Sequence, residues 1–74
     1  MSESPSATVG ANVRAEMARR KVPQREVADL LNLPQASVSK RLAGEVPWRI
    51  TELTKVADFL DVPVAVLLGE AAVA

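Results

Sequence analysis

The sequence predicts an all-α fold: a compact domain of five short helices. Apolar residues recur at intervals of three and four along most of the chain, which is the period of helices with one buried face. No apolar run alternates with period two in the β-branched pattern that half-buried strands show. Prolines and residues that tolerate a left-handed backbone divide the apolar stretches at short intervals. With 74 residues, 49% of them apolar, the chain suits one small domain with one core.

The first helix is expected to begin after Thr8, whose hydroxyl can cap a helix, and to end near Arg20 or Lys21, where cations suit the helix dipole. Its apolar stripe has a spacing of four and consists of Val9, Val13 and Met17. Residues 1–7 are expected to form a flexible polar arm, because they lack the basic and apolar regions of a signal peptide.

Only three residues are expected between the second and third helices. The second is predicted from Gln24, just after Pro23, to about Asn32, a residue that tolerates the left-handed conformation. The third is predicted over residues 34–43, because Pro34 fits a first helical turn and Gly44 can stop a helix. The residues expected to face inward are Val27, Ala28, Leu30 and Leu31 in the second helix, and Val38, Leu42 and either Leu33 or Ala36 in the third.

Two further helices complete the predicted domain, which spans residues 8–69. The fourth begins at about Ile50, or as late as Thr51, because Arg49 stands at its cap position. Val62 and Pro63 break it, and a short fifth helix ends at Gly69. The apolar faces are Leu53, Val56, Ala57 and Leu60, then Val64, Leu67 and Leu68. Residues 70–74 form a tail with no predicted element.

The composition argues against several functional classes. The chain has no cysteine and no histidine, so it lacks the commonest nucleophile, general base and soft metal ligands. We therefore expect no enzyme, no metal site, no cofactor and no small-molecule ligand. The longest apolar run, residues 62–68, is far shorter than the roughly 20 residues of a membrane span. A cytoplasmic location is expected, because a chain without cysteine suits a reducing compartment.

The net charge of zero conceals an uneven distribution. Residues 14–49 contain eight basic and four acidic side chains, a balance of +4. Residues 50–74 contain one basic and four acidic side chains, a balance of −3, and Glu3 supplies the last negative charge. Because electrostatic fields act locally, such a chain can present a basic face to nucleic acid. The alternative is that these charges are scattered over the surface and only keep the protein soluble.

The stretch "LPQASVSKRLAG", residues 33–44, suggests what such a face would do. Two helices joined by so short a turn cross at a steep angle, and the second projects from the domain. Its outward residues are small or carry hydrogen-bonding groups, as a helix entering the major groove requires. Bulky or acidic side chains there would collide with the groove or repel phosphate. These outward residues are Gln35, Ala36, Ser37, Ser39 and Lys40.

The sequence resembles the Xre-type helix-turn-helix family, which includes the lambda-like phage repressors and Cro proteins. The segments "VPQREVADLLNLPQASVSKRLAG" and "ELTKVADFLDVPVAVLL" carry the resemblance, which extends from about Val9 to Leu68. It implies a transcriptional regulator, a repressor or Cro-like protein, that binds a double-stranded DNA operator. It also implies a homodimer, at least on DNA, because one short helix contacts too few bases for useful specificity.

The resemblance further implies roles for individual residues. Residues matching base-contacting positions are Gln35, Ala36, Ser37 and Lys40. Residues matching phosphate-contacting positions, or lying close to them, are Gln24, Ser39, Arg41 and Arg49. A Gln35 amide can pair with adenine N6 and N7, and Lys40 can reach guanine or a phosphate. For Gln24, Gln35, Ser37 and Lys40, the simpler alternative is a solvated or locally hydrogen-bonded side chain.

The chain departs from the family pattern at two places. Pro23 stands where relatives usually have Ser or Thr as the cap of the second helix. Many phage repressors have a buried Arg–Glu ion pair at the positions of Met17 and Leu42, and both residues are apolar here. Exchanging both partners for apolar residues is often neutral or stabilising, so the two changes are expected to compensate. Trp48 is expected to cap the core below the fourth helix, with stacking on a DNA strand as the alternative.

Three alternatives for function and assembly remain open from the sequence. The same fold could serve as a protein-binding module, such as an antitoxin or antirepressor, which the zero net charge favours. The chain could also be the N-terminal part of a longer regulator. The dimer surface is expected to be the fifth helix with "GEAAVA", residues 69–74, unless that tail is frayed.

Overall fold

The computed structural model describes residues 5–69, and every regular element within that range is a helix. The elements are α1 (Pro5–Arg20), α2 (Gln24–Leu31), α3 (Gln35–Leu42), α4 (Ile50–Leu60) and α5 (Val64–Leu68). The predicted all-α fold is confirmed. The boundaries of α2 to α5 agree with prediction to within one or two residues, which is the usual uncertainty of helix ends.

The first helix begins earlier than predicted. α1 starts at Pro5, so Thr8 lies inside the helix and is not its N-cap, and residues 5–7 are helical. Proline suits the first position of a helix because its missing N–H needs no partner there. Pro5 was therefore the signal for the true start. The rest of the predicted arm, residues 1–4, and the predicted tail, residues 70–74, lie outside the described residues.

Three of the turns between helices share one construction. Each consists of a left-handed residue, an apolar residue and a proline: Lys21-Val22-Pro23, Asn32-Leu33-Pro34 and Asp61-Val62-Pro63. The left-handed residue donates its N–H to the carbonyl three residues back, and the apolar residue donates to the carbonyl five back. This is the Schellman arrangement, which satisfies the last carbonyls of a helix. The apolar residue packs on the core, and the proline leads directly into the next helix.

The left-handed conformation of Lys21 gives a first prediction. Its φ is 56°, a region that costs an ordinary L-residue roughly 1 kcal/mol or more and glycine almost nothing. Lys21→Gly should therefore raise the free energy of unfolding by about 1 kcal/mol, measured by urea denaturation. Asn32→Gly should gain less, because asparagine tolerates this conformation better. Destabilisation by Lys21→Gly would mean that the lysine side chain stabilises this turn by more than its backbone strain costs.

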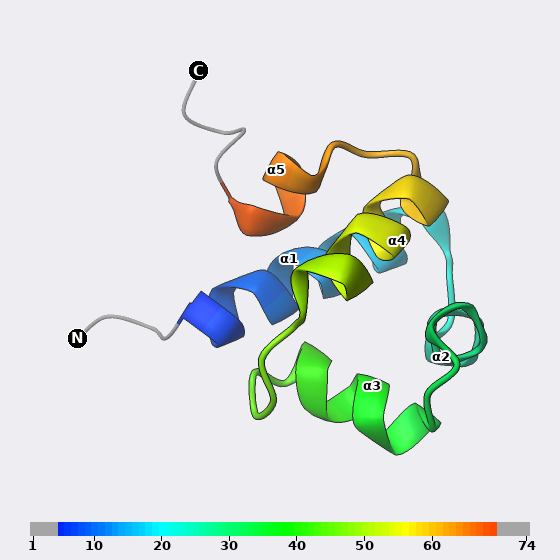
Figure 1. Ribbon diagram of the computed structural model, residues 1–74. Coiled ribbons are helices and arrows are strands. Elements are labelled where there is room, and N and C mark those ends of the chain that lie inside the picture. The colour runs from blue at the N-terminus through cyan, green and yellow to red at the C-terminus, as the bar shows by residue number, and fades with distance from the viewer. Residues whose placement is uncertain (1–4, 70–74) are drawn as a thin grey trace.

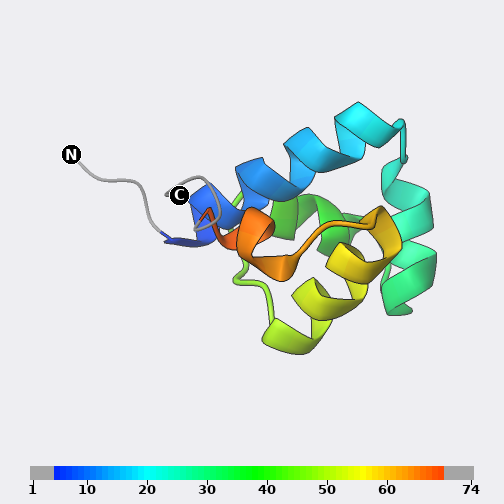
Figure 2. The ribbon, with the colours of Figure 1, turned by 90° about the horizontal axis from the view of Figure 1, so that it is seen from above.

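The helices enclose one apolar core. α1 and α4 lie in the middle of the domain, α3 and α5 lie on opposite sides of them, and α2 closes one end (Figures 1 and 2). Eleven buried residues form the core: Val13, Met17, Val27, Ala28, Val38, Leu42, Leu53, Val56, Ala57, Leu60 and Leu67. Met17 and Leu42, the two positions expected to compensate each other, are both buried in this cluster. Because α3 and α5 lie on opposite sides of the domain, α5 does not cover α3.

Candidate nucleic-acid interface

The helix pair α2–α3 has the geometry that the sequence predicted. Only residues 32–34 separate the two helices, and the left-handed Asn32 turns the chain sharply. Figure 1 shows α2 nearly end-on while α3 runs across the view, so the two helices cross steeply. α3 packs against α1 and α2 and lies at the edge of the domain. Such a pair presents its second helix to a partner.

The two faces of α3 differ completely in their burial. Val38 and Leu42, one turn apart, point into the core. Leu33, just before the helix, is partly buried against the same core, whereas Ala36 is exposed, which settles the choice that the sequence left open. The outward face is made by Gln35, Ala36, Ser39 and Lys40, with Ser37 half-buried at its border. The residues predicted to contact bases therefore lie on one accessible surface, apart from the partial burial of Ser37.

The residues predicted to contact phosphate divide into two groups. Gln24 is the exposed first residue of α2, Ser39 is exposed on α3, and Arg49 is exposed just before α4. Arg41 is different, because its side chain is only 12% exposed and its guanidinium has partners within the domain. The structure therefore does not present Arg41 as a free cation.

Arg41 forms an ion pair with Glu52 of α4. Its Nε lies 3.0 Å from Glu52 Oε1, and its Nη2 lies 3.3 Å from Oε2. Its Nη1 also donates to the backbone oxygen of Ser37 at 3.1 Å. The Glu52 side chain is 13% exposed, so both charges are largely removed from water. A two-point contact of this kind is directional as well as attractive.

Glu52 has a second role that the sequence analysis missed. Its Oε1 accepts the backbone N–H of Arg49 at 3.0 Å, which is half of a capping box. This bond gives the backbone N–H of Arg49 a partner at the start of the helix. α4 accordingly begins at Ile50 rather than at Thr51. A Glu three residues after a helix N-cap is a known signature, so the capping role was visible in the sequence. The pairing with Arg41 was not, because it joins residues eleven apart across a loop.

The carboxyl of Glu52 makes stability dependent on pH. Burial raises its pKa, but hydrogen bonds from the Arg41 side chain and the Arg49 backbone, with the charges of both arginines, outweigh burial and hold the pKa below the usual value of a glutamate. The lowered value means that the stabilisation is complete above the unfolded-state pKa and is lost as pH falls through the folded-state pKa. Glu52→Gln should lower the free energy of unfolding by about 2 kcal/mol at pH 7. The difference from wild type should shrink below pH 4.5 in urea titrations. A constant difference down to pH 3 would contradict this ionic role.

Two further groups hold the C-terminal end of α3. The Trp48 indole Nε1 donates to the backbone oxygen of Arg41 at 3.1 Å, and Arg14 of α1 donates to that of Leu42 at 2.7 Å. Both donors bind carbonyls of the last turn of α3, where the helix supplies few N–H partners of its own, and the Arg41 oxygen also accepts the backbone N–H of Gly44. Trp48 is also packed against the core, as the prediction of a core cap required. Gly10 lets α1 approach the C-terminal end of α3 closely, because a methyl group at this position would lie only 2.6 Å from the Leu42 backbone oxygen.

The basic side chains of α1 also have partners within the domain. Arg19 and Arg20 both pair with Glu16, which is buried. Arg14 is occupied by the end of α3, as described above. The structure thus gives these three arginines local roles. On α3 itself, Lys40 is the exposed cation and Arg41 the paired one.

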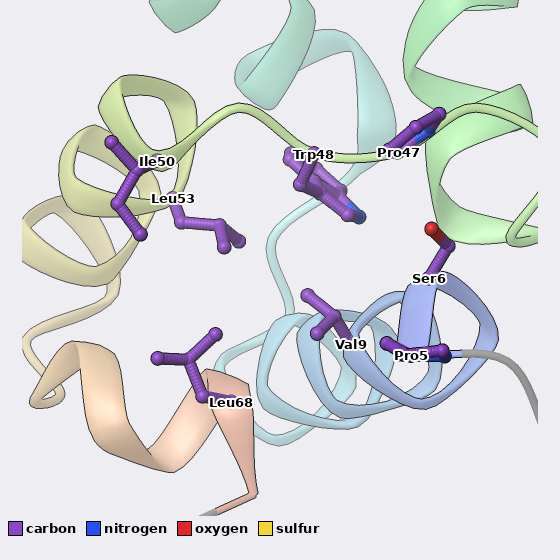
Figure 3. Close-up of a pocket in the computed structure, with 8 residues that line it drawn as sticks. All are labelled: Pro5, Ser6, Val9, Pro47, Trp48, Ile50, Leu53 and Leu68. Atoms are coloured by element: carbon purple, nitrogen blue, oxygen red, sulfur yellow. The ribbon is translucent and has the colours of Figure 1, made fainter.

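A shallow apolar groove lies away from the outward face of α3. It holds about 250 Å³ and is lined by Pro5, Ser6, Val9, Pro47, Trp48, Ile50, Leu53 and Leu68. In Figure 3 the Trp48 ring lies over its centre, between the start of α4 and the start of α1. Ile50 at its edge is 63% exposed, and Leu68 belongs to α5. The groove is thus lined by residues from the start of α1, the start of α4 and the end of α5.

The comparison with protein families fits this geometry. Residues 4–74 match the family model described as the BetR domain. The chain belongs to the BetR domain family. A BetR domain is a small DNA-binding domain of the helix-turn-helix superfamily and is regulatory rather than catalytic, so DNA binding is the coarse function of this chain. No curated protein and no solved structure gives a significant match.

Among residues 5–69 no group of acidic side chains is arranged to hold a metal ion. Within the same residues no helix has the length and hydropathy needed to cross a membrane.

Proposed function

We propose that this BetR domain is a sequence-specific transcriptional regulator that places α3 in the major groove of an operator, in the manner of Xre-type repressors and Cro proteins. The observation that carries the proposal is the division of α3 into two faces. Its buried face is fixed in the core by Val38 and Leu42, and its outward face is small and polar. A helix of this kind can approach base edges without steric or charge conflict. The regulator would act in the cytoplasm of a bacterium or of a phage host.

The exposed residues take separate roles in this proposal. Gln35 and Ala36, at the start of α3, contact bases, and Lys40 reaches a base or a phosphate one turn later. Ser37 contributes a base contact from the border of this surface. Gln24, Ser39 and Arg49 contact the phosphate backbone, which fixes the register of the domain on DNA without reading sequence. The phosphate contact expected for Arg41 is not retained, because Glu52 and Ser37 occupy its guanidinium.

A homodimer is the second part of the proposal, and its surface differs from the one expected from the sequence. The fifth helix was expected to supply the dimer face through Leu67 or Val66, but Leu67 is fully buried within the subunit, where it closes the core under α5. The partly exposed residues of α5 include Val66 and Leu68, and Leu68 is continuous with the apolar groove and Ile50. α3 and α5 lie on opposite sides of the domain, so pairing through α5 and the groove leaves α3 uncovered (Figure 1). The part of the expected dimer face in residues 70–74 lies outside the described residues.

Ile50 gives a test of that surface. Ile50→Glu should weaken binding to an operator with two half-sites about tenfold more than binding to one half-site, since half-site affinities multiply only when subunits are linked. Phe59→Glu is the matched control: Phe59 is 45% exposed, also on α4, but does not line the groove. Sedimentation of each complex gives the stoichiometry. Equal losses by Ile50→Glu on both DNAs would remove the groove from the dimer surface.

A protein-binding module is the second candidate function. The observation that favours it is the scarcity of free cations on α3, where Lys40 is exposed and Arg41 is paired. The balanced charge of the whole chain points the same way.

Selection of bound fragments from random DNA decides between the two candidates. A sequence-specific regulator should enrich one motif, and a dimer should enrich two copies spaced about one helical turn apart. The affinity for the enriched DNA should fall steeply with salt, because phosphate contacts release counterions. Failure to enrich any motif, together with a flat salt dependence, would favour the protein-binding module.

A further inference from the structure

The C-terminal turn of α3 is held from three directions. Arg14 of α1 binds the Leu42 carbonyl, Trp48 of the following loop binds the Arg41 carbonyl, and Glu52 of α4 binds the Arg41 side chain. The other end of α3, which begins at Gln35, is fixed mainly by the short turn from α2. The polar contacts of this helix are therefore concentrated at the end that is farther from Gln35 and Ala36, the base contacts proposed for its first turn.

The contact with α4 differs from the other two. α3 packs against α1 and α2, but the backbones of α3 and α4 do not come into close contact anywhere in residues 5–69. The Arg41–Glu52 pair spans the space between them and meets both carboxylate oxygens. Because Glu52 also caps α4 through Arg49, the side chain that receives Arg41 is itself fixed to the first turn of α4. The pair thus works as a brace between two helices.

The length of α3 makes such a brace important for binding. Arg41 lies six positions after Gln35, a distance of about 9 Å along the helix axis. A tilt of about 10° at the braced end would move the Gln35 end by roughly 1.5 Å, whereas paired hydrogen bonds need a placement within about 0.5 Å. A small change in the tilt of α3 at Arg41 therefore produces a larger displacement of Gln35, which is proposed to contact a base.

We propose that Arg41 and Glu52 are positioning residues for DNA recognition: their ion pair sets the tilt of α3, and neither side chain contacts DNA. The inference rests on the proposed function. It assigns specificity to a residue of α4 that lies outside the helix-turn-helix unit. It also replaces the expected phosphate contact of Arg41 by a role within the domain.

The test compares Arg41→Met, Glu52→Gln and the double variant on the enriched operator and on random DNA over a range of salt concentrations. Glu52→Gln keeps an oxygen that can accept the Arg49 N–H, so α4 keeps its cap. Each single variant should lower the ratio of operator to random affinity by about tenfold, with an unchanged salt slope. The double variant should lower the ratio no further than either single variant, because each single change already removes the pair. Circular dichroism and Trp48 fluorescence at the binding temperature establish that each variant is folded.

Each outcome is decisive. If Arg41→Met weakens operator and random DNA equally and lowers the salt slope by about one unit, Arg41 is a phosphate ligand and the inference is wrong. If the folded variants keep the wild-type ratio, the pair contributes to stability alone and the inference is also wrong. If Arg41→Met unfolds, the ratio for Glu52→Gln decides. A wild-type protein that does not distinguish operator from random DNA would overturn the proposed function itself and the inference with it.

Discussion

Leu42→Glu should be the most damaging single substitution considered for this domain. Leu42 is 3% exposed and lies in the core with Met17 and Val38, so a carboxylate there would be removed from water, and the nearby Arg14 guanidinium is already bound to the Leu42 carbonyl. An unpaired buried charge costs roughly 3 kcal/mol or more, which is a large share of the stability of so small a domain. We expect the variant to lose most of its thermal transition at pH 7, as measured by circular dichroism.

The controls for Leu42→Glu separate charge from shape. Leu42→Met changes little volume and should cost less than about 1.5 kcal/mol. Met17→Arg combined with Leu42→Glu restores the ion pair of the phage repressors and should recover part of the loss. A Leu42→Glu variant that melts like wild type would mean that α1 and α3 are not packed as described.

Gln35→Ala and Arg49→Ala should impair DNA binding in different ways. Gln35→Ala should cost about 1–3 kcal/mol on the operator and little on random DNA, because an amide contributes direction without releasing a counterion. Arg49→Ala should weaken both DNAs alike and lower the salt slope by about one unit, since a guanidinium on phosphate is indifferent to sequence. Binding titrations at several salt concentrations measure both effects.

Two control observations make this comparison sharp. Arg25→Ala removes another exposed charge, on α2, to which the proposal gives no DNA contact, and it should leave the salt slope nearly unchanged. Both Gln35 and Arg49 are exposed, so their variants should keep wild-type stability. If both alanine variants bind both DNAs as wild type does, α3 is not a recognition helix.

Periodicity and the residues that end helices were enough to predict the fold. The four-residue spacing of Val9, Val13 and Met17 identified α1, and the apolar faces of α2 and α4 were equally clear. The predicted start of α1 is wrong. The helix begins at Pro5, which suits the first helical position, and Thr8 is not its cap. Of the three left-handed positions, only Asn32 is predicted: lysine is unusual in the left-handed region, whereas aspartate tolerates it, so the signal at Asp61 was present in the sequence.

The candidate site was less predictable than the fold. Exposure of Gln35 and Lys40 follows from their position relative to Val38 and Leu42, so local spacing was sufficient. The environment of Arg41 depends on Glu52, which the chain brings back only after the loop that follows α3. Local patterns carry no information about such a contact. The same reason explains Leu67, whose apolar character fitted a dimer face and a core equally well until its burial was known.

Replacement of single operator purines by 7-deaza analogues tests the central claim most directly. These analogues remove the N7 acceptor from the major-groove edge and leave base pairing intact. If α3 reads that edge, wild-type affinity should fall at a short block of positions in each half-site. At one adenine in that block the loss should disappear in Gln35→Ala, because the group that used N7 is gone. Wild-type affinity that is unchanged at every position would contradict the placement of α3 in the major groove.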